Sequence, residues 1–145
     1  MMDFAQLAKH LAAAAARVRP ALEADLLVIG EAQKKIAQEM IGTEAPGWAP
    51  LAESTLTDKA AKGFPIPDPL LRTGEMRDSL RVEVEPTSFG AEMVLGSDDP
   101  VAKYQELGTA TIPPRPFLAT SAVEVMPMAK KKFGETAVTI LTPGA

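Results

Sequence analysis

Apolar residues recur every three or four positions through the first part of the chain. This spacing places them on one stripe of an α-helix. They are Phe4, Leu7, Leu11, Ala15, Val18, Leu22, Leu26, Ile29, Ile36 and Met40. Asp3 and Gln6 have the spacing of a capping box at a helix start, and Gly42 marks a stop. The pattern predicts a helical region over residues 3–41.

Pro20 interrupts this stripe. Proline removes one backbone hydrogen bond and disfavours helical geometry at the residue before it, so we expect a kink or two helices, over 3–19 and 20–41. A straight helix over the whole region would reach about 58 Å, whereas a compact chain of this length has a radius of gyration of about 15 Å. Either the region folds back as a helical hairpin, or a neighbouring subunit covers the rest of the stripe.

Residues 42–71 are predicted to be a proline-rich loop arm with one short helix. They contain five of the thirteen prolines, and proline and glycine mark turns and loops. Ser54 or Thr55 can cap the short helix, which we expect from Leu56 to Lys62. A second loop, over residues 108–116, contains three more prolines. Loops this long are uncommon in compact domains unless they have a function.

Residues 72–145 are predicted to hold an antiparallel hairpin, short helices and a C-terminal helix. Thr73 is expected to cap a turn of helix ending near Arg77. Apolar residues then alternate with charged or small ones, as in half-buried strands. They are Leu80, Val82, Val84, Phe89, Ala91, Met93 and Leu95. Asp99 as N-cap and proline in the first turn predict a short helix over Pro100–Leu107.

The end of the chain is predicted to return to the core at Phe117 and Leu118. Ser121 and Glu124 have the spacing of a second capping box, and apolar residues follow at four-residue intervals. We therefore expect a C-terminal helix. Its last part, residues 136–141, is open as either helix or a third strand.

The composition fits one folded domain over residues 1–145. The chain is 46% hydrophobic and 23% charged, which is ordinary for a globular domain. The predicted fold class is α+β. It consists of an N-terminal long or kinked helix, or a helical hairpin, packed on a small antiparallel β-sheet, with short helices and a C-terminal helix.

Charge and cysteine content exclude several classes of protein. A formal net charge of −4 argues against a general nucleic-acid or anionic-membrane binder. The sequence has no cysteine, so thiolate nucleophiles, redox pairs and thiolate metal sites are excluded. The alanine-rich run at residues 11–18 is far shorter than the roughly 20 residues of a membrane span. No signal-peptide pattern begins the chain, and we expect it to be made in the cytoplasm without a membrane contact.

We expect no enzyme activity, metal or cofactor. His10 is the only histidine, so paired-histidine zinc motifs are missing, and we expect it to face solvent. Asp98 and Asp99 are interpreted as turn and cap residues rather than catalytic carboxylates. The run Lys130–Lys132 is expected in the C-terminal part of a helix, where positive charge is favourable. No glycine-rich phosphate loop of a standard type occurs in the sequence.

Four strings of residues carry a family resemblance. They are GWAPL at 47–51, followed by Thr55 and Lys59, then LLRTGEMRDSL at 70–80, YQELGT at 104–109 and PRPFL at 114–118. In order and spacing, they resemble the small neck or tail-completion proteins of tailed bacteriophages, also called virion morphogenesis or minor head-tail joining proteins.

The resemblance implies a structural virion protein in a ring at the head-tail junction, without enzyme activity. Six-fold symmetry is favoured, with twelve-fold as the alternative. Its neighbours would be head-completion and tail-terminator or tail proteins, and genome DNA would pass through the ring without sequence-specific binding. The protein would be made in the host cytoplasm and reside in the virion. In a closed ring, an arm or strand edge of one subunit would reach the next.

Two other functions stay open at this point. The first is a different self-assembling phage part, such as a tail terminator or minor tail protein, which would form the same kind of ring but join a different partner. From another class, a nucleic-acid-binding regulatory module would use four basic residues of the first helical region. These are Arg17, Arg19, Lys34 and Lys35.

The candidate interface or structural residues lie in or beside the four strings. They are Trp48, Leu70, Leu71, Arg72, Thr73, Gly74, Met76, Arg77, Glu106, Gly108, Arg115 and Phe117. Trp48 is expected to plug the core or to anchor an interface. The apolar members at 70, 71 and 76 should bury against the helices, and Gly74 should permit a close backbone approach. For Glu106 and Arg115, one hypothesis is a bidentate ion pair that closes the loop or joins two subunits, and the alternative is two solvated charges.

Overall fold

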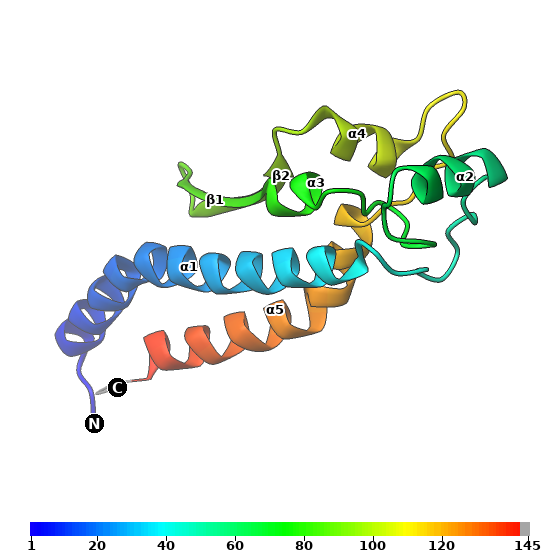
Figure 1. The fold of residues 1–145 in the computed structure, drawn as a ribbon. Coiled ribbons are helices and arrows are strands. Elements are labelled where there is room, and N and C mark those ends of the chain that lie inside the picture. The colour runs from blue at the N-terminus through cyan, green and yellow to red at the C-terminus, as the bar shows by residue number, and fades with distance from the viewer. Residues whose placement is uncertain (143–145) are drawn as a thin grey trace.

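The fold is α+β, as the sequence predicts. The computed structural model describes residues 1–142. Its elements are α1 (Phe4–Met40), α2 (Glu53–Ala61), α3 (Glu75–Asp78), β1 (Leu80–Pro86), β2 (Ala91–Ser97), α4 (Pro100–Leu107) and α5 (Leu118–Leu141). The long helix α1 lies between α5 on one side and the hairpin of β1 and β2 on the other (Figure 1). Helix α1 therefore takes part in both of the main packing interfaces.

Helix α1 is continuous through Pro20, so the predicted kink is correct and the helical hairpin is wrong. The Asp3–Gln6 capping box forms as expected, and the helix bends in its first half (Figure 1). The lost proline hydrogen bond allows a bend without ending the helix. The bend brings the first half against the end of α5, where an Nη of Arg17 donates to the carbonyl of Ile140 at 2.9 Å.

Helix α5 is also continuous, through Pro127 and Gly134, and residues 136–141 are helical. The alternative of a third strand is therefore wrong. The predicted Ser121 cap is wrong as well, because the helix begins three residues earlier. Ser121 is buried inside the first turns, where its hydroxyl donates to the carbonyl of Leu118 at 2.8 Å. The true cap is a side chain from α4, described below.

The hairpin pairs β1 with β2 in antiparallel register, with Val82 opposite Leu95 and Val84 opposite Met93. Strand β1 and helix α4 follow the sequence prediction, with Asp99 accepting a hydrogen bond from the amide of Val101. The prediction that Phe89 lies in the second strand is wrong, because β2 begins at Ala91 and Phe89 is fully exposed in the turn. Among residues 1–142, no third strand covers either edge.

A buried glycine sets the distance between α1 and the hairpin. A Cβ atom added to Gly30 would lie 2.5 Å from Cγ1 of Val82 and 3.1 Å from Cγ of Met93. Any larger residue at this position of α1 would force the hairpin outward. Glycine is unfavourable in a helix interior, so its presence here is explained by the close packing.

The apolar core has two parts. One lies at the C-terminal end of α1 and contains the buried side chains of Ala37, Ile41, Met76, Leu80, Ala102 and Phe117. The other lies midway along α1 against α5 and contains Ile29, Val125 and Ala129. The first half of α1 belongs to neither, and large apolar side chains on it remain exposed. They include Phe4, Leu7, Leu11 and Val18.

The molecule exposes more surface than a compact chain of its mass. Its accessible area is 9282 Å², whereas a compact monomer of this size has about 7,200 Å². The difference is about 2,000 Å², and it reflects the extended shape seen in Figure 1. Within the described residues, no helix is both long enough and apolar enough to cross a membrane.

Candidate interaction groove

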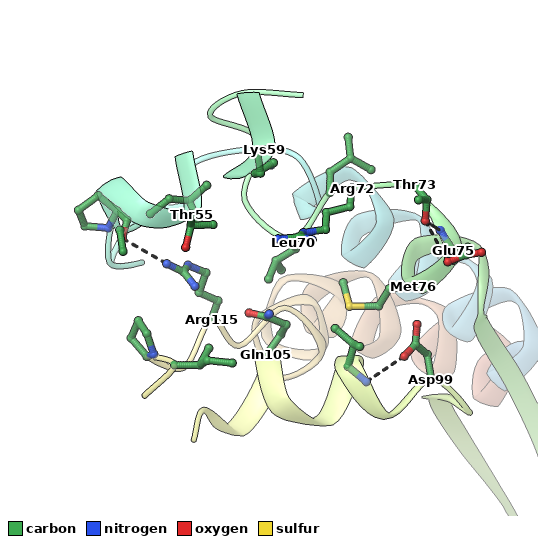
Figure 2. Close-up of a pocket in the computed structure, with 18 of the residues that line it drawn as sticks. Thr55, Lys59, Leu70, Arg72, Thr73, Glu75, Met76, Asp99, Gln105 and Arg115 are labelled. Atoms are coloured by element: carbon green, nitrogen blue, oxygen red, sulfur yellow. Dashed lines mark hydrogen bonds between the residues drawn. The ribbon is translucent and has the colours of Figure 1, made fainter. Parts of the chain in front are cut away.

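A groove of about 480 Å³ opens between α2, the segment 70–76, α4 and the loop 111–115. We call it the motif groove. The side chains of Leu70, Met76, Gln105 and Arg115 point toward its middle (Figure 2). Its lining is mainly apolar around these few polar groups, which is typical of a surface that binds a partner group.

All four strings of the family resemblance contribute to this groove. The first supplies Pro50 and Leu51, the second supplies residues 70–76, the third supplies Gln105 and the fourth supplies Arg115. These segments are far apart in the chain and meet only through folding. The structure therefore brings most of the candidate residues to one place.

Arg115 holds three of the strings together. It is only 5% exposed, and its guanidinium donates to the carbonyl of Ala49 at 2.9 and 3.2 Å and to that of Pro50 at 3.3 Å. Its backbone amide donates to the carbonyl of Gln105 at 2.7 Å. Burial lowers the pKa of this guanidinium. The charge is stabilised by carbonyl dipoles, since no carboxylate of residues 1–142 pairs with it.

The predicted ion pair between Glu106 and Arg115 is wrong. The Glu106 carboxylate accepts hydrogen bonds from the backbone amides of Phe117, Leu118 and Ala119, each at 2.8 Å. These amides have no partner within helix α5, and the positive end of the helix dipole attracts a carboxylate. Glu106 is therefore the N-terminal cap of α5, and it fixes α4 to that helix.

The segment 70–76 behaves partly as expected. Met76 is buried, and Leu70 and Leu71 are half-buried against the same core cluster. The predicted cap by Thr73 is wrong, because Gly74 is the N-cap of α3. The Thr73 hydroxyl, one residue earlier, accepts from the Glu75 amide at 3.4 Å.

Two residues of this segment adopt left-handed backbone conformations. Gly74 is the N-cap of α3 and has φ +91°. Glycine is needed here for this conformation, and not for the predicted close approach of the backbone. Leu70 has φ +66°, which costs a leucine about 1–2 kcal/mol. Such strained residues are found most often where a surface has a function.

The two arginines of the second string make surface ion pairs. An Nη of Arg72 lies 2.9 Å from a carboxylate oxygen of Asp58, and its guanidinium stacks 5.3 Å above the Phe64 ring. The hydrogen bond from Lys62, assisted by the charge of Arg72, holds the pKa of Asp58 below its usual value. Arg77 pairs with the neighbouring Asp78 at 3.2 Å.

The remaining candidates are structural. Trp48 is half-buried and packs against the core cluster, so it plugs the core. Gly108 ends α4 with φ +73°, and a Cβ there would lie 2.9 Å from the carbonyl oxygen of Ile112. Phe117 is fully buried, as predicted.

For two groove residues, the sequence predicted no role. Lys59 is only 2% exposed, and its ammonium donates to the carbonyl of Asp68 at 2.6 Å. Burial lowers its pKa. Gln105 has a buried Oε1 with no hydrogen-bond partner among the described residues. The only sequence signal for Lys59 is its spacing of one helical turn from Thr55, which puts the two residues on the same side of the helix.

Three further predictions from the sequence, at the start of α2, at Lys130–Lys132 and at His10, differ from the structure. Helix α2 begins at Glu53 with Ala52 as its N-cap, so the predicted cap by Ser54 or Thr55 is wrong. Lys130–Lys132 lie in the middle of α5, not in its C-terminal part, and Lys132 faces the buried Asp25 at 3.5 Å. His10 was expected to face solvent. Its Nε2 atom lies 3.0 Å from the carbonyl oxygen of Leu141, and its side chain is partly buried.

The four basic residues of α1 that the nucleic-acid hypothesis would use have partners within the chain. Arg17 bonds to Ile140 and Arg19 to Thr87, while the lysines pair with nearby carboxylates. The described part of the chain contains no group of three or more His, Asp or Glu residues placed to hold a metal ion.

Comparison with known proteins adds no relative. The chain matches no protein-family model, no curated protein and no solved structure. The resemblance to phage neck proteins rests on the four strings alone.

Proposed function

We propose that this chain is a structural virion protein of a tailed phage, a prophage or a gene-transfer particle. It forms part of a ring at the head-tail junction and completes the tail for joining to the head. The observation that carries the proposal is that the four strings resembling the neck proteins meet around the motif groove. Strings that resemble a family in order and spacing, and that also lie together in this fold, support a shared surface better than scattered matches do.

The shape of the molecule supports self-assembly. A ring subunit has two neighbours, and each interface of standard size takes about 800 Å² from it. Two such interfaces correspond to about 1,600 Å², close to the surface that this chain exposes beyond a compact monomer. The apolar side chains on the first half of α1, such as Phe4 and Leu11, and the open edges of the hairpin are available to neighbours.

The decisive test is genetic. Disrupting the gene in the virus that encodes it should leave DNA-filled heads and finished tails that do not join, seen by electron microscopy. Supplying the intact gene from a plasmid should restore joining. Normal virions without the gene would overturn the proposal.

A second test uses the purified chain. Its mass, measured by sedimentation at increasing concentration, should rise to a discrete assembly of several copies without added DNA. A mass that depends on DNA would instead favour the nucleic-acid module. A monomer at high concentration would contradict self-assembly.

A further inference from the structure

The turn of the hairpin presents a fixed apolar knob. Phe89 is fully exposed, although large aromatic side chains are usually covered. The turn around it is held in place, because the Thr87 amide donates to the Gly90 carbonyl at 3.0 Å and Arg19 of α1 donates to the Thr87 carbonyl at 3.2 Å. A side chain on a preordered turn loses little conformational entropy on binding.

The motif groove lies at the opposite end of the same layer. Figure 1 shows the turn of the hairpin at one end and the groove elements α2 and α4 at the other. The groove has a volume of about 480 Å³ and an apolar lining that includes Leu70, Met76, Val101 and Ile112. Since binding hot spots are most often aromatic side chains in such pockets, the groove suits one phenylalanine with its flanking backbone.

Charge at the two ends is complementary. Near the turn, Glu85 lies directly opposite Glu92 in the strand register, and neither has an ion-pair partner in residues 1–142. Two carboxylates in this position repel each other. The groove lining holds three cations, those of Lys59, Arg72 and Arg115, and two carboxylates, those of Glu75 and Asp99, so cations are in excess. Lys59 and Arg115 bond only to carbonyl oxygens. An acidic turn approaching this groove would gain on both sides.

We propose that the turn of one copy, residues 87–90, inserts Phe89 into the motif groove of a second copy. The proposal rests on the self-assembly part of the proposed function and specifies its contact. Turn and groove are different patches at opposite ends, so the contact is head-to-tail and each copy can bind two neighbours. Contacts of this kind close into rings when the rotation between copies allows it.

Disulfide trapping tests the contact directly, because the chain has no cysteine of its own. Ser88→Cys labels the turn and Thr111→Cys labels the groove rim. The two variants mixed under mild oxidation should form a mixed disulfide dimer, and each variant alone should stay largely uncrosslinked. Dimers from Ser88→Cys alone would show that turns meet turns and would overturn the proposal.

Complementary blocking variants test it a second way. Phe89→Asp removes the knob, and Val101→Trp fills the groove. Each variant alone should associate at least tenfold more weakly than the unmodified chain in sedimentation, while an equal mixture should form one-to-one dimers. The control is Val94→Asp, an exposed residue on the same hairpin away from the turn, which should assemble normally.

These outcomes separate the contact from the wider function. Circular dichroism melting should show that every variant is folded. If both blocked variants assemble like the unmodified chain and no mixed disulfide forms, the turn-to-groove contact is wrong while ring assembly stands. If the unmodified chain itself does not associate, both proposals fail.

Discussion

The two halves of α1 differ in what surrounds them, although they form one helix. After Pro20, the helix packs between α5 and the hairpin, and Ala37 is fully buried. Before Pro20, it contacts the end of α5 through Arg17 and His10 and leaves Phe4 91% exposed. We call residues 4–19 the leading segment. The same apolar stripe faces a core after Pro20 and a free surface before it. An apolar pattern that forms a helix therefore does not by itself form a core.

The largest expected effect is the difference in stability loss between replacing a phenylalanine in the core and replacing one in the leading segment. Phe117→Ala in the core should lower the free energy of unfolding by about 3–5 kcal/mol, because it leaves a cavity. Phe4→Ala in the leading segment should change it by less than about 0.5 kcal/mol. Urea unfolding of dilute protein measures both. Equal losses would mean that the leading segment is part of the core.

The glycine between α1 and the hairpin gives the next effect. Gly30→Ala places a Cβ within 2.5 Å of Val82, and overpacking of about 1–3 kcal/mol should outweigh the gain of about 1 kcal/mol from alanine in a helix. Gly134→Ala in α5 is the matched control, since nothing lies within 4 Å of its added Cβ. It should stabilise the protein. Stabilisation by both changes would contradict the close packing at α1.

Removing the cap of α5 should have an effect of similar size. Glu106→Gln loses a charge that three amides share, and we expect a loss of about 1–3 kcal/mol in unfolding free energy. Glu124→Gln, an exposed residue of the same helix, should be neutral. Hydrogen exchange should be faster at the first turn of α5 in the Glu106 variant. Unchanged exchange there would remove the capping role.

Acid should give the smallest effect and should act at the groove end. The folded-state pKa of Asp58 is lowered chiefly by its hydrogen bond with Lys62, so the folded state binds fewer protons than the unfolded state. Its contribution to stability is present above about pH 4 and is lost as the pH falls through the folded pKa. The difference in melting temperature between the unmodified chain and Asp58→Asn should therefore shrink in acid. A constant difference would exclude this linkage.

Local signals predicted much of the fold. The capping box at Asp3, the alternation in β1 and the Asp99–Pro100 start of α4 each depend on neighbours within a few residues, and all three appear as expected. The error at Phe89 and the choice left open at residues 136–141 have a different origin. There the apolar pattern fits two structures, and contacts with α1 decide between them.

The groove was harder to predict than the fold. Its segments could be named in the sequence, but their meeting depends on Arg115 bonding to Ala49 and on Glu106 capping α5. The opposite charges of Glu106 and Arg115, nine residues apart, suggested an ion pair. In the folded chain, Glu106 instead accepts from backbone amides and Arg115 donates to backbone carbonyls. The strained backbone of Leu70 has no sequence signal at all.

The contact between the two ends of the described chain also sets an order of events during synthesis. The carbonyls of Ile140 and Leu141 bond to Arg17 and His10. A ribosome adding about 5–20 residues per second needs roughly 6–25 seconds to travel from one partner to the other. During that interval the nascent first helix is without the neighbour that translation supplies later.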